Sequence, residues 1–352
     1  MYPDRNIDQR NAEKSAANII RKLEGSYAFA ILRPDKIIAG RDTFGTAPLY
    51  CGGNKSFSAV ASERKALWTL GIRNTHSFPP GNLAVISAKG FSFKPVAVVK
   101  QPEQKPVTVK QAAKRLQTLL LKSTRDRTSD VNKVAVAFSG GLDSTIVAVL
   151  AEKCVSEVNL VTVGLENQPE LLVAKKAAES LRLPLHLQAY TAADVERALE
   201  KVLWLTEEPN VMKASVAIPF FWTTETASEM GCKVLLAGQG ADELFGGYHR
   251  YLSDFRLGGA QALQKSMFRD VALSYETNFQ RDEPVCAYHG VDLRLPYVDS
   301  EVARCAFSLP INMKIDSADD SLRKRVLRQV ARNLGIPDFV VNRPKKAVQY
   351  AT

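Results

Sequence analysis

A glycine-rich turn from Ser139 to Ser144 carries the residue types best suited to chemistry in this chain. Its sequence is Ser-Gly-Gly-Leu-Asp-Ser, and it follows the apolar run from Val134 to Phe138. Two adjacent glycines let the main chain approach an anion closely, the two serines offer hydroxyls, and a helix that begins at the turn adds unpaired N–H groups. The turn is therefore predicted to bind phosphate.

Asp143 lies inside this turn, where its carboxylate would repel a phosphate. A divalent cation between the two removes the repulsion, so the combination predicts a nucleotide site with Mg²⁺. The spacing differs from the Walker A pattern, in which four residues separate two glycines and Lys-Ser/Thr follows. The alternative is a tight strand-to-helix turn without a ligand, but a carboxylate beside two glycines has no packing purpose there.

A second turn, from Ala237 to Tyr248, follows another apolar run and holds four glycines and an Asp-Glu pair. If both apolar runs are strands of one sheet, the two turns emerge side by side, and Asp242 can join Asp143 on the same magnesium ion. An Asp at a helix start is also a common N-cap. The presence of two such turns favours the metal-binding interpretation.

An alternation of strands and helices must position these turns, and it begins at Lys133. We predict strands at 133–138, 158–163, 184–187 and 232–236. Helical patterns lie between them, as is typical of a parallel sheet, whose ligands bind at the carboxyl ends of strands. A further helix is expected from Val109 to Arg127, and helical patterns dominate from Glu243 onward.

The N-terminal part of the chain is predicted to form a smaller, β-rich domain. Short strands are expected at 27–32, 36–39, 56–60 and 83–86. The next stretch holds three prolines among polar residues and predicts a linker. The expected organisation is a β-rich domain at 1–93, a linker at 94–108 and an α/β domain at 109–352.

Composition places the chain among ordinary globular proteins, and 352 residues suffice for two domains. The five cysteines are far apart and show no metal-ligand spacing with the four histidines, so we expect reduced thiols, no structural zinc and a cytoplasmic location. No signal segment or membrane-length apolar run is expected. The net charge of +10 permits an anionic partner, but the basic residues are scattered, so we do not expect nucleic acid.

Five motifs, taken in order, resemble the glutamine-dependent asparagine synthetase family. They are Ser139–Ser144, Val163–Glu166, Gly238–Tyr248, Gly290–Asp299 and Arg343–Lys345. The N-terminal segments Leu23–Phe29, Arg41–Tyr50, Ala61–Leu67 and Pro79–Gly81 are similar to the second half of that family's N-terminal-nucleophile (Ntn) glutaminase domain. The resemblance implies a parallel-sheet ATP-pyrophosphatase (adenine nucleotide alpha hydrolase-like) synthetase domain with a partial Ntn-hydrolase-like domain before it.

The resemblance also implies a reaction and roles for individual residues. A carboxylate, the β-carboxylate of aspartate, attacks the α-phosphate of ATP and releases pyrophosphate, and ammonia then displaces AMP to give asparagine. ATP or pyrophosphate would be bound by Ala137, Ser139, Gly140, Gly141, Asp143, Ser144, Val163, Gly164, Gly238 and Arg328, with Mg²⁺ on Asp143 and Asp242. The catalytic residues would be Lys345, Gln239 and Asp242. Lys324, one turn before Arg328, could assist with pyrophosphate, although a solvated basic face is the more common arrangement for such a pair.

Two departures from the family pattern stand out. Members that hydrolyse glutamine begin with a nucleophilic cysteine, whereas this sequence begins Met1-Tyr2. Cys51 is expected to be a small buried apolar residue instead. We therefore expect no glutaminase activity from this polypeptide alone, and either a separate polypeptide that supplies the missing half or a structural remnant in a homo-oligomer that uses free ammonia.

The second departure is Gln239, where asparagine synthetases usually have Glu, since an amide can orient groups but cannot accept a proton. Asp292 replaces another usual Glu and is expected to pair with Arg294. Three alternatives to an asparagine synthetase stay open. They are a β-lactam-synthetase-like enzyme with another acyl acceptor, an RNA-modifying adenylating enzyme, and a weakened subunit that serves as a scaffold.

Overall fold

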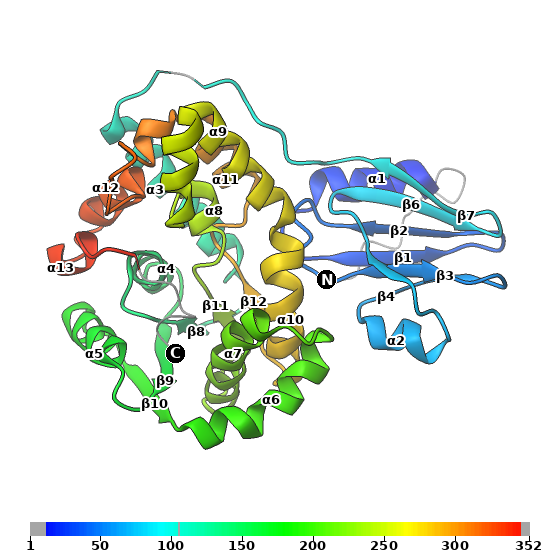
Figure 1. Ribbon diagram of the computed structural model, residues 1–352, viewed down its shortest axis with the longest axis horizontal. Coiled ribbons are helices and arrows are strands. Elements are labelled where there is room, and N and C mark those ends of the chain that lie inside the picture. The colour runs from blue at the N-terminus through cyan, green and yellow to red at the C-terminus, as the bar shows by residue number, and fades with distance from the viewer. Residues whose placement is uncertain (1–11, 105, 346–352) are drawn as a thin grey trace. The chain divides into compact units, whose positions relative to one another are not determined.

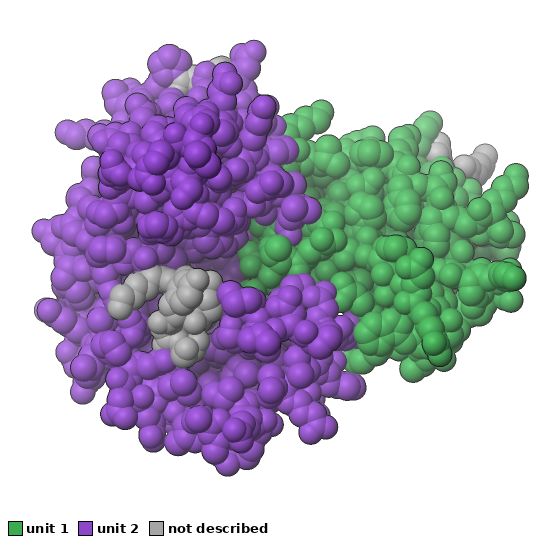
Figure 2. All heavy atoms as spheres, in the orientation of Figure 1, with its two compact units in different colours: residues 1–100, 274–283 green, residues 101–273, 284–352 purple. Residues whose placement is uncertain are grey.

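The computed structural model describes residues 12–104 and 106–345. The chain divides into two compact units, coloured separately in Figure 2. Unit 1 comprises residues 1–100 and 274–283, and unit 2 comprises residues 101–273 and 284–352. Each unit has its own sheet or sheets and its own hydrophobic core.

Unit 2 is built around a parallel sheet, which has five strands among the described residues. The strands are β8 (Lys133–Ala137), β9 (Glu157–Leu165), β10 (Leu185–Tyr190), β11 (Val234–Leu236) and β12 (Asp292–Arg294). Their order is β10-β9-β8-β11-β12, and every neighbouring pair is parallel. The predicted α/β class with a parallel sheet is confirmed.

The strand order contains a reversal that locates the ligand site. From β8 the chain proceeds outward to β9 and β10, and it then returns to β11 on the other side of β8. The connections that follow β8 and β11 therefore run in different directions, and the switch point lies at the carboxyl ends of these two strands. Such a switch point is where open parallel sheets bind ligands.

Helices connect and cover the strands of unit 2 (Figure 1). They are α3 (Val109–Asp126), α4 (Leu142–Glu152), α5 (Pro169–Leu181), α6 (Ala192–Thr206), α7 (Val211–Glu229), α8 (Ala241–Phe245), α9 (Arg250–Ser274), α10 (Gln280–Tyr288), α11 (Ser300–Ser308), η3 (Ile311–Met313), α12 (Arg325–Asn333) and α13 (Asp338–Val341). Helices α4, α5 and α7 pack directly on the strands, while α3 and α12 pack on α4. Helix α4 is buried from Leu142 to Ala151, so it forms the centre of the unit.

Local sequence explains several helix ends. Helix α3 begins with a capping box in which the Thr108 side chain accepts from the Gln111 N–H, and Gln111 accepts from Thr108 in return. The same arrangement of Thr191 and Asp194 begins α6. The strands expected in this half are all present with shifted ends, whereas β12 was not predicted, because three residues are too short to show an alternating pattern.

Unit 1 holds two antiparallel sheets. One has the order β1-β2-β6-β7 and the other the order β4-β3-β5. The strands are β1 (Ala28–Leu32), β2 (Ile37–Arg41), β3 (Tyr50–Gly53), β4 (Ser58–Ala61), β5 (Thr75–Ser77), β6 (Asn82–Ser87) and β7 (Gly90–Pro95), with helices α1 (Ala12–Lys22) and α2 (Arg64–Thr69). Strand β7 pairs with β6 as far as Pro95, so Lys94 and Pro95 belong to the sheet although the sequence placed them in the linker.

The core of unit 1 has three layers of side chains, which make a helix-sheet-sheet-helix sandwich. On β2, Ile38 faces the α1 cluster and its neighbour Ala39 faces the second sheet, as the alternation of a strand requires. On β3, Cys51 lies between the sheets, whereas Tyr50 packs with Leu67 of α2. The predicted β-rich N-terminal region is confirmed.

A segment far along the sequence completes unit 1. It contains the π-helix η2 (Tyr275–Phe279), which joins α9 to α10. The Arg41 guanidinium is fully buried and lies 5.3 Å from the centre of the Tyr275 ring. The Ser77 hydroxyl donates to Gln280 Oε1 at 3.0 Å. Nothing in the sequence indicated that residues 274–283 belong with the N-terminal strands.

Candidate active site

The turn after β8 has the geometry of an anion site. Gly140 has a φ of +64°, and a Cβ on it would lie 2.8 Å from the Ala174 Cα of α5, so only glycine fits. Gly141 is the N-cap of α4. The hydroxyls of Ser139 and Ser144 are 3.2 Å apart, and Ser144 Oγ also donates to the Gly141 carbonyl. Two hydroxyls thus gather at a helix N-terminus, where the dipole favours negative charge.

The turn after β11 touches the first turn. A Cβ on Gly238 would lie 3.1 Å from the Asp143 Cβ, so the main chain after β11 passes directly over that side chain. Gly240, with a φ of +88°, is the N-cap of α8, and Asp242 is the second residue of that helix. Asp242 is therefore not the N-cap considered from the sequence.

Two carboxylates and two ammonium groups form a cluster between these turns. Lys324 Nζ lies 2.5 Å from Asp143 Oδ2 and 2.5 Å from Asp242 Oδ1. Lys345 Nζ lies 3.1 Å from Asp242 Oδ2 and 3.7 Å from Asp143 Oδ2. Lys324 is 2% exposed and Asp143 is 8% exposed. Charges buried to this extent persist only with partners, and each carboxylate has both lysines beside it.

The cluster holds Asp242 and Lys345 in their charged forms. Burial alone would raise the pKa of Asp242, but Lys324 and Lys345 outweigh it and hold that pKa well below its ordinary value. Burial alone would lower the pKa of Lys345, but Asp242 and Asp143 outweigh it and hold the pKa above its ordinary value. A carboxylate and an ammonium group therefore face each other across the site at neutral pH.

The carboxylates suit magnesium. Asp143 Oδ1 is buried and has no hydrogen-bond partner among the described residues. Within that same part of the chain, no group of three or more His, Cys, Asp or Glu side chains could hold a metal. Mg²⁺ is commonly bound by one or two carboxylates and by substrate phosphates, which is the ligand set that Asp143 and Asp242 beside an anion-binding turn would provide.

Lys324 is not on a solvated basic face, so that expectation was wrong. It is the N-cap residue of α12 and has a left-handed backbone with a φ of +52°. Because this conformation turns the chain just before the helix, the side chain points into the cluster instead of following the helical repeat. The sequence spacing of four to Arg328 therefore placed it on the wrong face.

Arg328 has a different position from the one expected of a pyrophosphate ligand. Its guanidinium is buried and donates to the main-chain carbonyls of Leu322, Arg323, Val341 and Arg343. The first two carbonyls precede Lys324, and the other two precede Lys345. Arg328 therefore ties together the two segments that carry the lysines.

The remaining predicted residues lie near the carboxyl ends of the strands. Ala137 is the last residue of β8, Val163 and Gly164 lie near the end of β9, and Gln239 follows Gly238 in the second turn. A Cβ on Gly164 would lie 2.8 Å from Gln168 Oε1, so the main chain there is closely packed.

Asp292 begins β12 and so lies at the opposite end of a strand from these turns. Its expected pairing with Arg294 is confirmed, with 2.7 Å between Asp292 Oδ2 and Arg294 Nε. The Arg294 guanidinium also binds Asp130. The substitution at Asp292 thus falls in a surface ion-pair network.

Two contributors were missed from the sequence. The Tyr297 hydroxyl is buried and donates to the main-chain carbonyl of Asp143 at 3.3 Å. A Cβ on Gly247 would lie 1.7 Å from Asp242 Oδ1 and 2.3 Å from Lys324 Cε, so glycine is required for the ion pair to form. Gly247 was visible as part of the glycine-rich turn, whereas a lone tyrosine carried no signal.

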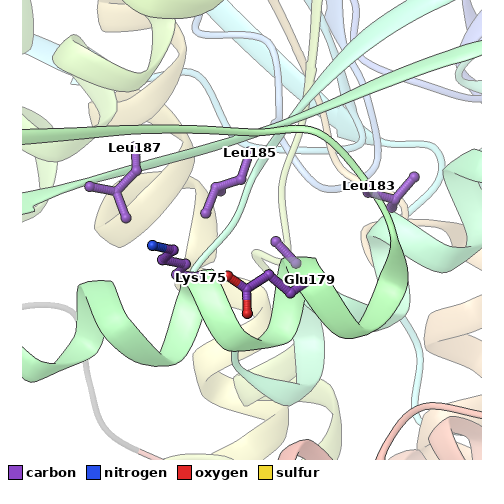
Figure 3. Close-up of a pocket in the computed structure, with 6 residues that line it drawn as sticks. Lys175, Glu179, Leu183, Leu185 and Leu187 are labelled. Atoms are coloured by element: carbon purple, nitrogen blue, oxygen red, sulfur yellow. The ribbon is translucent and has the colours of Figure 1, made fainter.

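A cavity of about 370 Å³ lies away from these groups, between α5 and the edge strand β10. Figure 3 shows the leucines of the strand segment facing Lys175 and Glu179 of the helix. Its lining residues are Lys175, Ala178, Glu179, Leu183, Leu185 and Leu187. None of them is a predicted site residue, so the cavity is separate from the charged cluster.

Comparison with protein families finds that residues 115–352 match asparagine synthase and residues 6–69 match a glutamine amidotransferase domain. The chain belongs to the asparagine synthase family. The resemblance predicted for both halves is confirmed. This family consists of ATP-dependent carbon–nitrogen ligases, and the charged cluster of this member lies within the matched synthase region.

Relatives of this asparagine synthase family member have a similar sequence over most of the chain. A Methanocaldococcus jannaschii protein named "Putative asparagine synthetase (glutamine-hydrolyzing) 1" is 33% identical, over 95% of this chain and 70% of its own length. Asparagine synthetases of Triphysaria versicolor and Brassica oleracea are each 28% identical over 90% of this chain. The chain spans only 56% of the length of these two plant relatives.

Among solved structures, an NMN synthetase from Francisella tularensis aligns with 69% of this chain and 78% of its own. The sequence identity is 12% and the TM-score is 0.38, so the match adds nothing to the family assignment.

Proposed function

We propose that this protein is an AMP-forming ligase that adenylates the β-carboxylate of aspartate and transfers ammonia to it, giving asparagine, AMP and pyrophosphate. One observation carries the proposal. Asp143, Asp242, Lys324 and Lys345 meet between the turns that leave β8 and β11, beside the two serine hydroxyls. Opposite charges arranged around an anion-binding turn are suited to phosphoryl chemistry on a nucleotide.

In the first step, a carboxylate oxygen forms a bond to the α-phosphorus of ATP. The bond between the α-phosphorus and the bridging oxygen breaks, and its electron pair leaves with pyrophosphate. Ser139, Gly140, Gly141 and Ser144 would cradle this leaving group through hydroxyls and main-chain N–H groups. Lys345 would face the charge that develops on the α-phosphate, where a fixed ammonium group stabilises a transition state most effectively.

In the second step, ammonia attacks the acyl carbon of the adenylate. The carbon–oxygen bond to AMP then breaks and one proton is released. Gln239 can orient the attacking nitrogen by hydrogen bonds but cannot take its proton, because an amide has no basic oxygen or nitrogen in this pH range. Lys345 would stabilise the negative charge of the tetrahedral intermediate.

Asp143 and Asp242 would hold Mg²⁺, and the buried Asp143 Oδ1, which has no hydrogen-bond partner among the described residues, supports this role. A bound Mg²⁺ would neutralise phosphate charge. The main chain at Ala137, Val163, Gly164 and Gly238 would accommodate adenine and ribose, because these residues lie near the carboxyl ends of the neighbouring strands β8, β9 and β11. Lys324 would add a second ammonium group toward pyrophosphate.

Ammonia is the proposed nitrogen donor for the polypeptide itself. Cys51 is the cysteine that the sequence of unit 1 provides, and it is buried, with its thiol donating to the His76 carbonyl. Burial raises the pKa of this thiol to about 11, which opposes a nucleophilic role. We propose that a separate glutaminase polypeptide or free ammonia supplies the nitrogen.

The proposed setting of the enzyme is a homo-oligomer in the cytoplasm. All five cysteines are unpaired, which suits a reducing compartment. Within the described residues no helix is both long and apolar enough to span a membrane.

The proposal is tested by incubating the purified protein with ATP, Mg²⁺, aspartate and either ammonium or glutamine. AMP, pyrophosphate and asparagine are expected in equal amounts with ammonium. Pyrophosphate release that does not depend on any amino-acid carboxylate would contradict the proposal. Turnover with a different acid in place of aspartate would favour the alternative acyl acceptor that Gln239 leaves open.

A further inference from the structure

Arg323 is a buried cation that the site described so far does not use. Arg323 is 4% exposed, and its Nε has no hydrogen-bond partner among the described residues. Burial lowers the pKa of its guanidinium, and the nearby carboxylates of Asp242 and Asp320 only partly offset that effect. A buried guanidinium with an unpaired donor is costly, so its retention calls for a ligand.

Arg323 adds a third cation to the charged cluster. Arg323, Lys324 and Lys345 bring three positive charges to a cluster that has two carboxylates, Asp143 and Asp242. Asp320 stabilises the loop before α12, because its Oδ1 accepts hydrogen bonds from the main-chain N–H groups of Leu322 and Arg323. Glu243 is buried near Lys345, so carboxylates balance the three cations, and Arg323 is the cation of this group whose Nε has no partner among the described residues.

The backbone holds Arg323 in this place against its conformational preference. Arg323 and Lys324 both have a φ of +52°, a conformation that costs a non-glycine residue free energy. The Arg323 N–H is bound by Asp320, and its carbonyl accepts from Arg328 Nε at 2.7 Å. Contacts at both ends of the turn thus fix two consecutive cations near Asp242.

We infer that the Arg323 guanidinium receives a phosphate group of the pyrophosphate leaving group. This inference rests on the proposed function. Lys324, the next residue, contacts both carboxylates that are proposed to hold Mg²⁺, and the Arg323 guanidinium is near one of them, Asp242. A guanidinium offers paired donors that match phosphate oxygens, and pyrophosphate is the most highly charged group of the proposed reaction.

The test measures binding of inorganic pyrophosphate and of AMP by calorimetry in buffer with Mg²⁺. Arg323→Gln is expected to weaken pyrophosphate binding by about 10- to 100-fold, the effect of one charge-assisted contact, and to leave AMP binding within about twofold. The matched control is Arg325→Gln. Arg325 is two residues after Arg323, is exposed and forms an ion pair with Asp316. Its pyrophosphate affinity is expected to stay within about twofold of the parent.

A second measurement separates ligand binding from a structural role. Because Arg323 lacks a partner for Nε, the ligand-free Arg323→Met variant is expected to unfold at the same temperature as the parent or higher. Its stabilisation by pyrophosphate is expected to be smaller. A large loss of stability without ligand, or failure to fold, would show that the guanidinium is structural and would overturn the inference.

The outcomes also separate this inference from the proposed function. If the parent protein binds pyrophosphate and Arg323→Gln binds it equally well, the inference alone is wrong. An equal loss of AMP and pyrophosphate affinity would place the contact at the α-phosphate and would also overturn it. If the parent binds neither MgATP nor pyrophosphate, the proposed function itself is wrong.

Discussion

At the scale of single residues, Asp143 has the most constrained environment in the site. It contacts Lys324, lies near Lys345 and has one buried oxygen without a partner among the described residues. Asp143→Asn keeps the shape but removes the charge that the proposed binding of Mg²⁺ requires. Pyrophosphate release from ATP is expected to fall by about 10³-fold or more, measured with a coupled pyrophosphate assay.

The control for this change is Asp292→Asn, because Asp292 is an exposed carboxylate at the far end of β12. Its activity is expected to stay within about threefold of the parent. Normal pyrophosphate release by the Asp143 variant would show that the metal is held elsewhere.

Lys345 is expected to act on the transition state and not on ATP binding. Its ammonium group already has Asp242 as a partner at 3.1 Å, so the ground state does not depend on a phosphate contact. Lys345→Ala should lower kcat by about 10²- to 10³-fold while the Kd for ATP changes by less than about threefold. Steady-state kinetics with equilibrium ATP binding measures both. Weaker ATP binding at an unchanged kcat would rule out this role.

Sequence patterns were sufficient for residues whose role depends on the main chain. The turn at Ser139–Ser144 and the turn that holds Asp242 were both predicted, because glycine spacing and apolar runs determine where strands end. Lys324 was misplaced because helical periodicity assumes a helix that includes it, whereas a left-handed residue at the N-cap reverses its direction. Arg328 was assigned to pyrophosphate because a sequence does not show which carbonyls surround a guanidinium.

At the scale of elements, one arginine holds the N-terminus of α12 against the segment after α13. The Arg328 guanidinium makes five hydrogen bonds to four carbonyls. Lysine has only three donors on a point charge, so Arg328→Lys leaves buried carbonyls unpaired, at about 1–3 kcal/mol each. We expect a lower unfolding temperature, faster amide exchange at 322–328 and 341–345, and reduced turnover.

Arg332→Lys on the same helix is the matched control, because Arg332 is exposed and donates to the side-chain oxygen of Asn342. It should leave exchange rates and turnover close to those of the parent. Unchanged exchange in the Arg328 variant would show that the two segments are held by other contacts.

A further prediction concerns Gly247, which lies close to both Asp242 of α8 and Lys324 at the start of α12. A Cβ there would overlap Asp242 Oδ1, so Gly247→Ala must displace the carboxylate from Lys324. Pyrophosphate release is expected to fall by at least about tenfold, since the two elements must separate. Gly231→Ala is the control, because Gly231 has open space around it and a positive φ that costs about 1 kcal/mol but lies outside the site. Equal activity of the two variants would contradict the steric argument.

The elements themselves were predictable to different degrees. The strands β8, β9, β10 and β11 follow from apolar runs, and the switch point follows from their order once they form one sheet. Their order cannot be obtained from the runs, because β11 and β9 have similar apolar sequences and either could neighbour β10. The π-helix η2 was also beyond sequence reasoning, since its placement depends on Arg41 and Ser77, more than 190 residues away.

At the scale of the whole molecule, stability is expected to depend on Lys314. This residue is 2% exposed, and burial lowers its pKa from 10.5 to about 7, with only a small opposing effect from Cys305. Between pH 7 and pH 10.5 the unfolded chain binds a proton at this lysine that the folded protein does not, so stability rises with pH in this window. Lys314→Met should remove that rise.

The measurement is the free energy of unfolding in urea from pH 7 to pH 10, compared between parent and variant. The variant is expected to be more stable than the parent by about 1–4 kcal/mol at pH 7 and to converge with it at high pH. Parallel pH profiles would show that Lys314 is solvated or paired in the folded protein.

The segment 274–283 has a consequence for how the chain matures during synthesis. Unit 1 is discontinuous, and the ring that covers the buried Arg41 is translated more than 230 residues after that arginine. Domains normally fold as they leave the ribosome, starting from the N-terminus. Here the N-terminal strands must wait, with part of their interior open to water, until most of the synthase region has been made. The interior around Arg41 is therefore open to chaperones and proteases at least until residue 275 has been synthesised.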